Sequence, residues 1–144
     1  MSVGGGMSEG ADAERLATKT PLVLIVDDDV DFLDIAQAAL EAQGFSVERA
    51  KGGLRGVFLA TQEVPDAVLC DLRMPGLDGF VVAEALRADA ATQHTALLAC
   101  TGRRDLWTRA MLLKSAFDAV LLKPVDWDEA ARKLWETIAA RAEK

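Results

Sequence analysis

Five aspartates lie within eight residues in the stretch VLIVDDDVDFLD, directly after an apolar run of strand length. This run is followed directly by Asp27, Asp28 and Asp29, and a second apolar run, AVLC, is followed by Asp71. Carboxylates that lie close together raise each other's pKa unless a cation neutralises them. A hard divalent ion such as Mg2+ binds one or two carboxylates together with carbonyl oxygens, waters and phosphate oxygens. These residues therefore predict a site for a metal and a phosphate.

Two further polar residues follow apolar runs in the same way. Thr101 comes after ALLAC, and Lys123 comes after AVLL. An ammonium supplies a point charge for one phosphoryl oxygen, a hydroxyl can hydrogen-bond another, and a carboxylate can attack phosphorus as a nucleophile. Carboxylate, metal, hydroxyl and ammonium together form a set for phosphoryl transfer, in which catalysis is mostly positioning and charge neutralisation.

The elements that must position these residues follow from the apolar pattern. Runs that are apolar throughout are expected of parallel strands covered by helices on both faces, and the segments between them have helical spacing. We predict an α/β fold, a doubly wound three-layer sandwich of five strands and five helices. Gly44 is predicted to end the first helix, and Asp126 to cap a last helix that reaches about Arg141. The strand runs are residues 22–26, 45–47, 67–70, 96–100 and 119–122.

Composition limits the classes of function. The chain has 144 residues and a formal net charge of −7, which argues against direct binding of nucleic acid. Residues 1–20 read as a flexible leader, and residues 21–144 as one domain. The sequence contains neither a secretory signal nor an apolar run near the roughly 20 residues that span a bilayer, so we expect a cytoplasmic protein without a membrane partner. Cys70 and Cys100 are predicted to be reduced core residues.

The motifs VDDD, CDLRMPGLDGF, CTG and LLKPV, in this order and at these separations, resemble the receiver domain of two-component response regulators. The resemblance covers roughly residues 21–140 and implies a flavodoxin-like sheet with strand order 2-1-3-4-5. It implies that Asp71 accepts a phosphoryl group from a histidine kinase, a phosphotransfer protein or a small donor such as acetyl phosphate. Such a module is no enzyme, except that it catalyses its own phosphorylation and dephosphorylation.

The same resemblance implies a ligand set for Mg2+. Asp28 and Asp71 would bind the ion directly together with the backbone carbonyl of Arg73. Asp27 would lie beside them and hold metal-bound water. Asp29 falls just past the acidic pair, and we predict that it is the N-cap of the first helix.

Roles for the remaining site residues also follow from the resemblance. Thr101 would move toward the phosphoryl group, and Lys123 would pair with it. Pro124 matches a cis-proline position, and bonds before proline are the ones for which the cis form costs little. Together with Asp71, these residues would carry the phosphoryl-transfer chemistry.

Three positions depart from the pattern of the family. Val120 stands where the family commonly has an aromatic switch residue, and valine cannot act as that rotor. Arg73 and Arg103, two residues after Asp71 and Thr101, flank the expected phosphoryl position, where they could hold or shield the group or simply be solvated. Ala116 replaces a glycine that often ends the fourth helix.

The resemblance places the partner surface on the fourth helix, the fifth strand and the fifth helix. Trp107 and Met111 of the fourth helix are predicted to form part of an interface patch. The expected partners are a histidine kinase or phosphotransfer protein and an unidentified output protein, with a homodimer through the fourth and fifth helices as an alternative. The small and charged residues at the C-terminal end favour a stand-alone regulator that acts by protein contact.

The sequence is compatible with two other functions. LIVDDDV also resembles the Asp-x-Asp motif of haloacid-dehalogenase-type phosphatases, with Asp27 as nucleophile and Asp29 as general acid, but that reading leaves DLRMPGLDGF unexplained. The second is a phosphorylation-independent receiver that acts as a binding module. The presence of all the residues expected for phosphoryl transfer argues against this alternative. The absence of an aromatic residue at position 120 leaves it as a second candidate.

Overall fold

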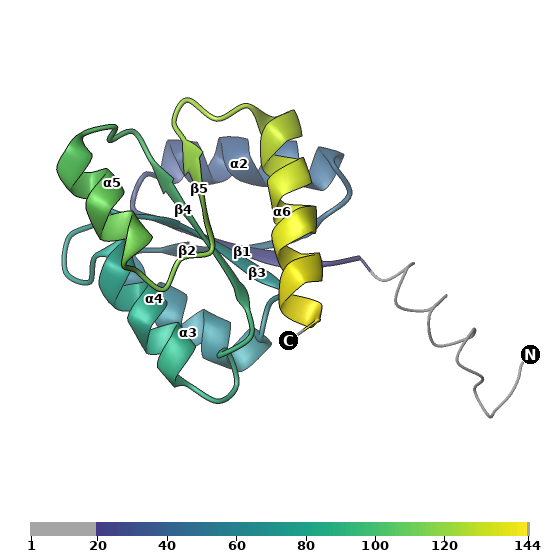
Figure 1. Cartoon of the computed structure of the whole chain (residues 1–144). Helices are drawn as coiled ribbons and strands as arrows, with labels where there is room; N and C mark the ends of the chain where they lie inside the picture. Colours follow the sequence, from purple (N-terminus) through teal and green to yellow (C-terminus); the bar gives the residue numbers. More distant parts are fainter. Residues whose placement is uncertain (1–19, 144) are drawn as a thin grey trace, which may run out of the picture.

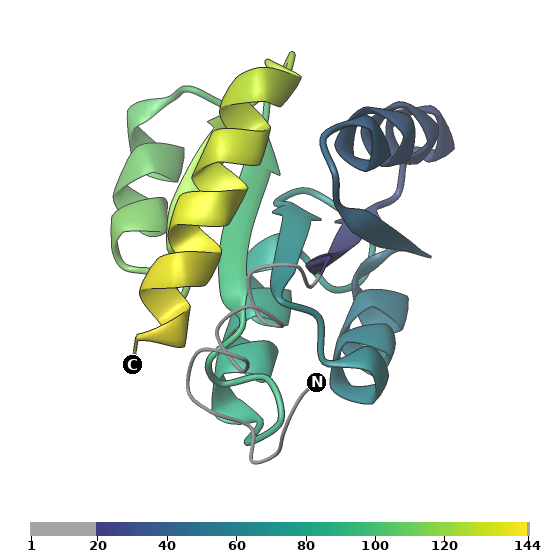
Figure 2. The same cartoon turned by 90° about the vertical axis from the view of Figure 1, so that its right-hand side faces the viewer.

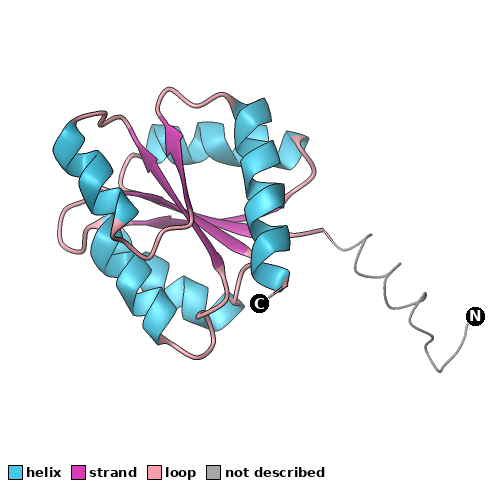
Figure 3. Ribbon diagram, viewed as in Figure 1, coloured by secondary structure: helices cyan, strands magenta, loops and turns pink. Residues whose placement is uncertain are grey.

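The computed structural model describes residues 20–143, which form a five-stranded parallel sheet flanked by five helices (Figures 1 and 3). The strand order is β2-β1-β3-β4-β5, so the predicted doubly wound, flavodoxin-like α/β fold is confirmed. The predicted leader, residues 1–20, lies outside the described residues apart from Thr20. In chain order the elements are β1 (Leu22–Asp27), α2 (Val30–Ala42), β2 (Ser46–Lys51), α3 (Gly53–Glu63), β3 (Ala67–Asp71), α4 (Gly79–Ala88), β4 (Ala96–Thr101), α5 (Leu106–Leu113), β5 (Ala119–Leu122) and α6 (Trp127–Ala142).

Helices cover both faces of the sheet, with α2 and α6 on one face and α3, α4 and α5 on the other (Figures 1 and 2). Successive residues of β1 therefore enter different cores. Val23 and Ile25 pack with α2 and α6, while Leu24 and Val26 pack with α3 and α4. This two-sided burial is why the strand is apolar throughout. None of the helices within residues 20–143 has the length and apolar character needed to cross a membrane.

The edge strand β2 differs from its predicted extent. The run at residues 45–47 predicted a short strand, whereas the strand covers Ser46–Lys51 and Phe45 precedes it as a buried core residue. Within residues 20–143, β1 alone pairs with β2, and exposed polar residues such as Glu48 interrupt the apolar pattern of the strand. Arg49 of this strand donates to Asp34 of α2 at 2.6 Å. Pairing with β1, rather than an apolar run, therefore determines where β2 ends.

Aspartates begin four of the helices. Asp29, Asp78, Asp105 and Asp126 are the N-caps of α2, α4, α5 and α6, and the side chain of each accepts at least one backbone N–H from the first turn. The predictions for Asp29 and Asp126 are thus confirmed. Gly44, with φ 96°, lies in the left-handed region directly after the C-cap Gln43, in agreement with the prediction that it ends this helix. Part of the acidic excess of the chain therefore stabilises helix ends.

The two cysteines are free, buried and directed into different cores. Cys70 packs with α3 and α4, and Cys100 packs with α2 and α6. Burial raises the pKa of Cys70 well above its usual range and that of Cys100 to about 12. The prediction that both cysteines are core residues without a disulfide is confirmed, and their raised pKa values keep the thiols protonated.

Gly79, the first residue of α4, lies against the end of β3. A Cβ at this position would collide with the backbone oxygen of Asp71 and lie 2.9 Å from the Cα of Leu72. We expect Gly79→Ala to lower the free energy of unfolding by about 1–3 kcal/mol, because the backbone must shift to admit the methyl group. Urea denaturation measures this loss. Gly102→Ala is the control, since a Cβ there meets no atom within 4 Å, and equal losses in both variants would contradict the explanation.

Candidate functional site

Four strands bring the predicted site residues to one edge of the sheet. Asp27 ends β1, Asp71 ends β3 and Thr101 ends β4, while Lys123 directly follows β5. The strands are parallel, so their carboxyl ends lie at the same edge. This is the edge at which open α/β sheets bind ligands.

Three carboxylates converge at this edge. Asp27, Asp28 and Asp71 each offer an oxygen, and these oxygens lie within 4.8 Å of one another. The side chain of Asp27 is only 1% exposed. Burial, followed by the charge of Asp27, raises the pKa of Asp71 above its ordinary value, although Lys123 offsets part of this effect. The cluster is therefore short of positive charge.

Lys123 is the ammonium that partly balances the cluster. Its Nζ donates to Asp27 Oδ2 at 2.9 Å and lies 3.7 Å from Asp71 Oδ1. Burial alone would lower the pKa of Lys123, but the hydrogen bond with Asp27 and the charge of Asp71 raise it overall. One ammonium against three ionised carboxylates leaves two negative charges. This donor set and this charge fit a hard divalent cation such as Mg2+.

Asp29 does not join the cluster. Its Oδ1 accepts from the backbone N–H groups of Asp31 at 3.0 Å and Phe32 at 3.4 Å. Because the Asp29 carboxylate caps the N-terminus of α2, it is not placed to act as a general acid beside Asp27. The geometry therefore argues against the phosphatase alternative.

Arg103 links Thr101, at the end of β4, to the start of α5. The buried Thr101 Oγ1 accepts from the backbone N–H of Arg103 at 3.0 Å, and its own hydroxyl proton is free to donate in another direction. The Arg103 side chain donates through Nε to Asp105 Oδ1 at 2.9 Å. Hydrogen bonds from Thr108 and Arg103 hold the pKa of Asp105 well below its usual range. The Arg103 guanidinium is thus held at the N-terminus of α5, a contact that the sequence did not predict.

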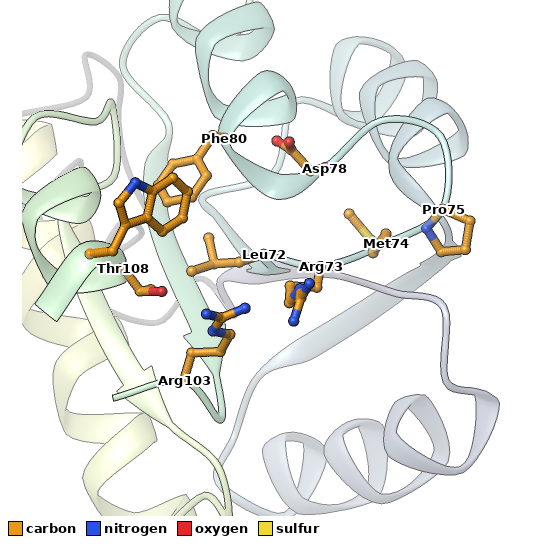
Figure 4. Close-up of a pocket in the computed structure, with 9 residues that line it drawn as sticks. Leu72, Arg73, Met74, Pro75, Asp78, Phe80, Arg103 and Thr108 are labelled. Atoms are coloured by element: carbon orange, nitrogen blue, oxygen red, sulfur yellow. The ribbon is translucent and has the colours of Figure 1, made fainter. Parts of the chain in front are cut away.

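Arg73 and Arg103 line the same pocket, of about 460 Å³, between the loops that follow β3 and β4 (Figure 4). Phe80 and Trp107 form part of its apolar wall. Among residues 20–143, no side chain forms a hydrogen bond or ion pair with the Arg73 guanidinium. The two arginines therefore share a pocket, and of the two only the Arg103 guanidinium has a side-chain partner within residues 20–143.

Of the departures from the family pattern, Val120 lies in β5, whereas Ala116 lies beyond the end of α5 rather than at it. Val120 is half-buried in β5, and its carbonyl oxygen accepts from Lys133 Nζ at 3.0 Å. The Lys123–Pro124 peptide bond is cis, as predicted. Helix α5 ends at Leu113 with Lys114 as its C-cap, before Ala116.

Sequence reasoning missed one aromatic contact of the site. Lys123 Nζ lies 4.2 Å from the centroid of the Phe32 ring. Phe32 lies in the first turn of α2, three residues after the N-cap Asp29. Only the fold reveals that Lys123 lies against its ring, because the two residues are far apart in the sequence.

Comparisons with known proteins agree with this geometry. The family model described as "Response regulator receiver domain" matches residues 23–134. Protein PilH of Pseudomonas aeruginosa is 38% identical over 104 residues, which cover 72% of this chain and 86% of PilH. The crystal structure of the receiver domain of sensor histidine kinase PA1611 from Pseudomonas aeruginosa PAO1, with a magnesium ion coordinated in its active site cleft, has a TM-score of 0.78 and 26% identity. The match covers 84% of this chain and 99% of that domain.

Some relatives are much longer than this chain. The DNA-binding dual master transcriptional regulator RpaA of Synechocystis sp. is 36% identical over 109 residues, which are 76% of this chain but 45% of RpaA. The match covers 14% of the sensor protein GacS of Pseudomonas syringae and 23% of the response regulator PleD of Caulobacter vibrioides. The chain thus spans less than half the length of these curated relatives.

The excess negative charge of the site predicts that Asp71 destabilises the metal-free protein but strengthens its binding of Mg2+. We expect Asp71→Asn to raise the urea midpoint of the metal-free protein, because it removes a carboxylate whose raised pKa shows that its charge is unfavourable in the folded state. Saturating Mg2+ should stabilise the wild type by about 2.7 kcal/mol at a hundredfold excess over Kd, and the variant by less. Urea denaturation in EDTA and in Mg2+ tests both statements. Equal stabilisation of both proteins by Mg2+ would show that Asp71 is not a ligand.

Proposed function

This chain belongs to the response regulator receiver domain family of two-component systems, and we propose that it accepts a phosphoryl group on Asp71. The donor would be a histidine kinase, a phosphotransfer protein or a small acyl phosphate. One observation carries the proposal: the carboxylates of Asp27, Asp28 and Asp71 meet within 4.8 Å, and Lys123 Nζ lies 3.7 Å from Asp71 Oδ1. This arrangement supports a nucleophile for phosphorus beside a cation site.

In the proposed reaction, a carboxylate oxygen of Asp71 attacks the phosphorus of the donor. An O–P bond forms, the P–N bond of a phosphohistidine or the P–O bond of an acyl phosphate breaks, and the leaving group keeps the bonding electrons. Lys123 pairs with one phosphoryl oxygen, and the Thr101 hydroxyl donates to another. Hydrolysis by water restores the carboxylate. The chain thus acts on itself rather than on a released substrate.

Mg2+ is the ion that the donor set fits. Asp28, Asp71 and the backbone carbonyl of Arg73 would hold it, with Asp27 on the water that it binds. When bound, the ion supplies positive charge that neutralises the phosphoryl oxygens. Asp27 already forms a hydrogen bond with Lys123, so the same carboxylate orients the ammonium toward the position of the phosphoryl group.

Intact-mass spectrometry tests the phosphoacceptor role. After brief incubation with Mg2+ and acetyl phosphate, we expect the wild type to gain the mass of one phosphoryl group and Asp71→Asn to gain none. Asp34→Asn is the control, because that carboxylate is exposed on α2 and pairs with Arg49 instead. The gain should disappear in EDTA. An unmodified wild type that also fails to bind beryllofluoride would point to the alternative, a receiver that acts as a phosphorylation-independent binding module.

The proposed output surface lies along α5, β5 and α6, where a groove of about 760 Å³ separates the two helices. Arg104, Arg109 and Lys133 line it, and Leu113 is 89% exposed in α5. These cations stand out in a chain of net charge −7. The groove therefore suits an acidic partner segment with apolar anchors.

Two acidic residues, Asp118 and Glu129, line the groove against four cations, because Arg103 lines it as well. Asp118 already pairs with Arg87 at 3.2 Å and with Arg141 at 2.5 Å. A symmetric dimer through this surface would bring the arginines of two copies together, since each copy contributes the same patch. The charges thus favour a heterologous acidic partner over the homodimer that the sequence left as an alternative.

A displayed library of random peptides tests the chemistry of this surface. Peptides selected on the protein loaded with Mg2+ and beryllofluoride are expected to be acidic with spaced apolar residues. Replacing both arginines, Arg104→Glu with Arg109→Glu, should weaken their binding about tenfold or more, because two favourable charge pairs become repulsive. Arg55→Glu on α3 is the control and should have no effect. Neutral or basic selected peptides would contradict the assignment.

A further inference from the structure

The ring of Phe32 covers the ammonium of Lys123. Nζ lies 4.2 Å from the ring centroid, while the same atom is 2.9 Å from Asp27 Oδ2 and 3.7 Å from Asp71 Oδ1. The ammonium thus has carboxylates and an aromatic face around it, and the Lys123 side chain is only 26% exposed. An ammonium in this position is attracted to the electron-rich face of the ring.

Two neighbours fix the ring itself. Phe32 lies in the first turn of α2, whose N-cap Asp29 also accepts the backbone N–H of Phe32. Its ring contacts that of Trp127, the first residue of α6, with centroids 5.9 Å apart and planes tilted by 39°. Both rings pack against the core that lies between the sheet and the helices α2 and α6. Phe32 therefore contacts Trp127 as well as Lys123.

We propose that Phe32 is a positioning residue for Lys123, and that Trp127 holds Phe32 in place. The inference rests on the proposed phosphoacceptor function. A lysine has a flexible four-carbon stem and is strongly hydrated, so an uncovered ammonium samples many positions in water. The ring restricts Nζ to the neighbourhood of Asp27 and Asp71, where a phosphoryl oxygen would need it. No part of this role requires Phe32 to touch the reacting atoms.

The contact also reaches α6, one of the helices of the proposed output surface. Val120 has no ring that could turn, so the usual aromatic position of β5 offers no aromatic contact to the site. Phe32 instead connects Lys123 to Trp127 through two adjoining contacts of 4.2 Å and 5.9 Å. A shift of Lys123 toward a phosphoryl group would therefore change the surroundings of the Trp127 ring.

A fluorination series at position 32 tests the inference. Mono-, di- and trifluorophenylalanine keep the shape of the ring and progressively weaken its attraction for a cation. We expect the rate of Asp71 phosphorylation by acetyl phosphate in Mg2+ to fall stepwise along the series. Phe32→Leu should be roughly fivefold slower than the wild type. Phe32→Tyr, which keeps the ring, should restore the rate.

Phe45 provides a matched control. Its ring contacts Trp135 of α6 with centroids 5.3 Å apart and planes tilted by 35°, in the same core and nearly the same geometry, but within residues 20–143 no ammonium lies over it. The same fluorinated residues at position 45 should leave the rate unchanged. A rate that does not depend on fluorine at position 32, or that falls equally at position 45, would overturn the inference.

An NMR measurement separates this outcome from a failure of the proposed function. In the metal-free protein, the Lys123 side-chain protons near Nζ should show an upfield ring-current shift that Phe32→Leu removes and Phe45→Leu retains. Absence of that shift in the wild type would overturn the inference directly. If the wild type shows the upfield shift but takes up no phosphoryl group, the phosphoacceptor function is refuted. The positioning role, which rests on that function, is then refuted as well.

Discussion

The repulsion among three carboxylates at one edge of a sheet is the constraint on which the rest of this structure depends. Asp27, Asp28 and Asp71 lie within 4.8 Å of one another, and Lys123 compensates for only one of their charges. Such a cluster stays together only if the strands that carry it cannot separate. Strands β1, β3 and β4 meet this condition, because helices bury them on both faces and two cores hold their side chains. The same repulsion is what favours a cation at this edge of the sheet.

The sequence predicted the parts of this arrangement that local chemistry determines. Apolar runs identified the buried strands, and the polar residues that end them identified Asp27, Asp71, Thr101 and Lys123 as neighbours. Asp29 was predicted correctly as an N-cap because capping needs only a short side chain and the next turn of helix. The strand order, by contrast, came from the resemblance to a family rather than from the pattern of residues.

What the sequence did not reveal depends on contacts between distant segments. The extent of β2 was wrong because an edge strand is half exposed, so hydrogen bonding to β1 rather than apolar periodicity decides its length. The contact between Phe32 and Lys123 joins residues 91 positions apart, as their numbers 32 and 123 give. Asp118 binds Arg87 and Arg141 from two other elements. No local spacing carries such information.

Any effect of phosphorylation on a partner must come from contacts that differ between the two states of the chain. The contacts that would change first are those made by the groups that a phosphoryl group would bind. In the present structure Lys123 Nζ donates to Asp27, and Thr101 Oγ1 accepts from the backbone N–H of Arg103. The first contact leads through Phe32 to Trp127 at the start of α6, and the second leads to the loop that enters α5. Both routes end on the helices that flank the basic groove, so Val120 need not move for that surface to change.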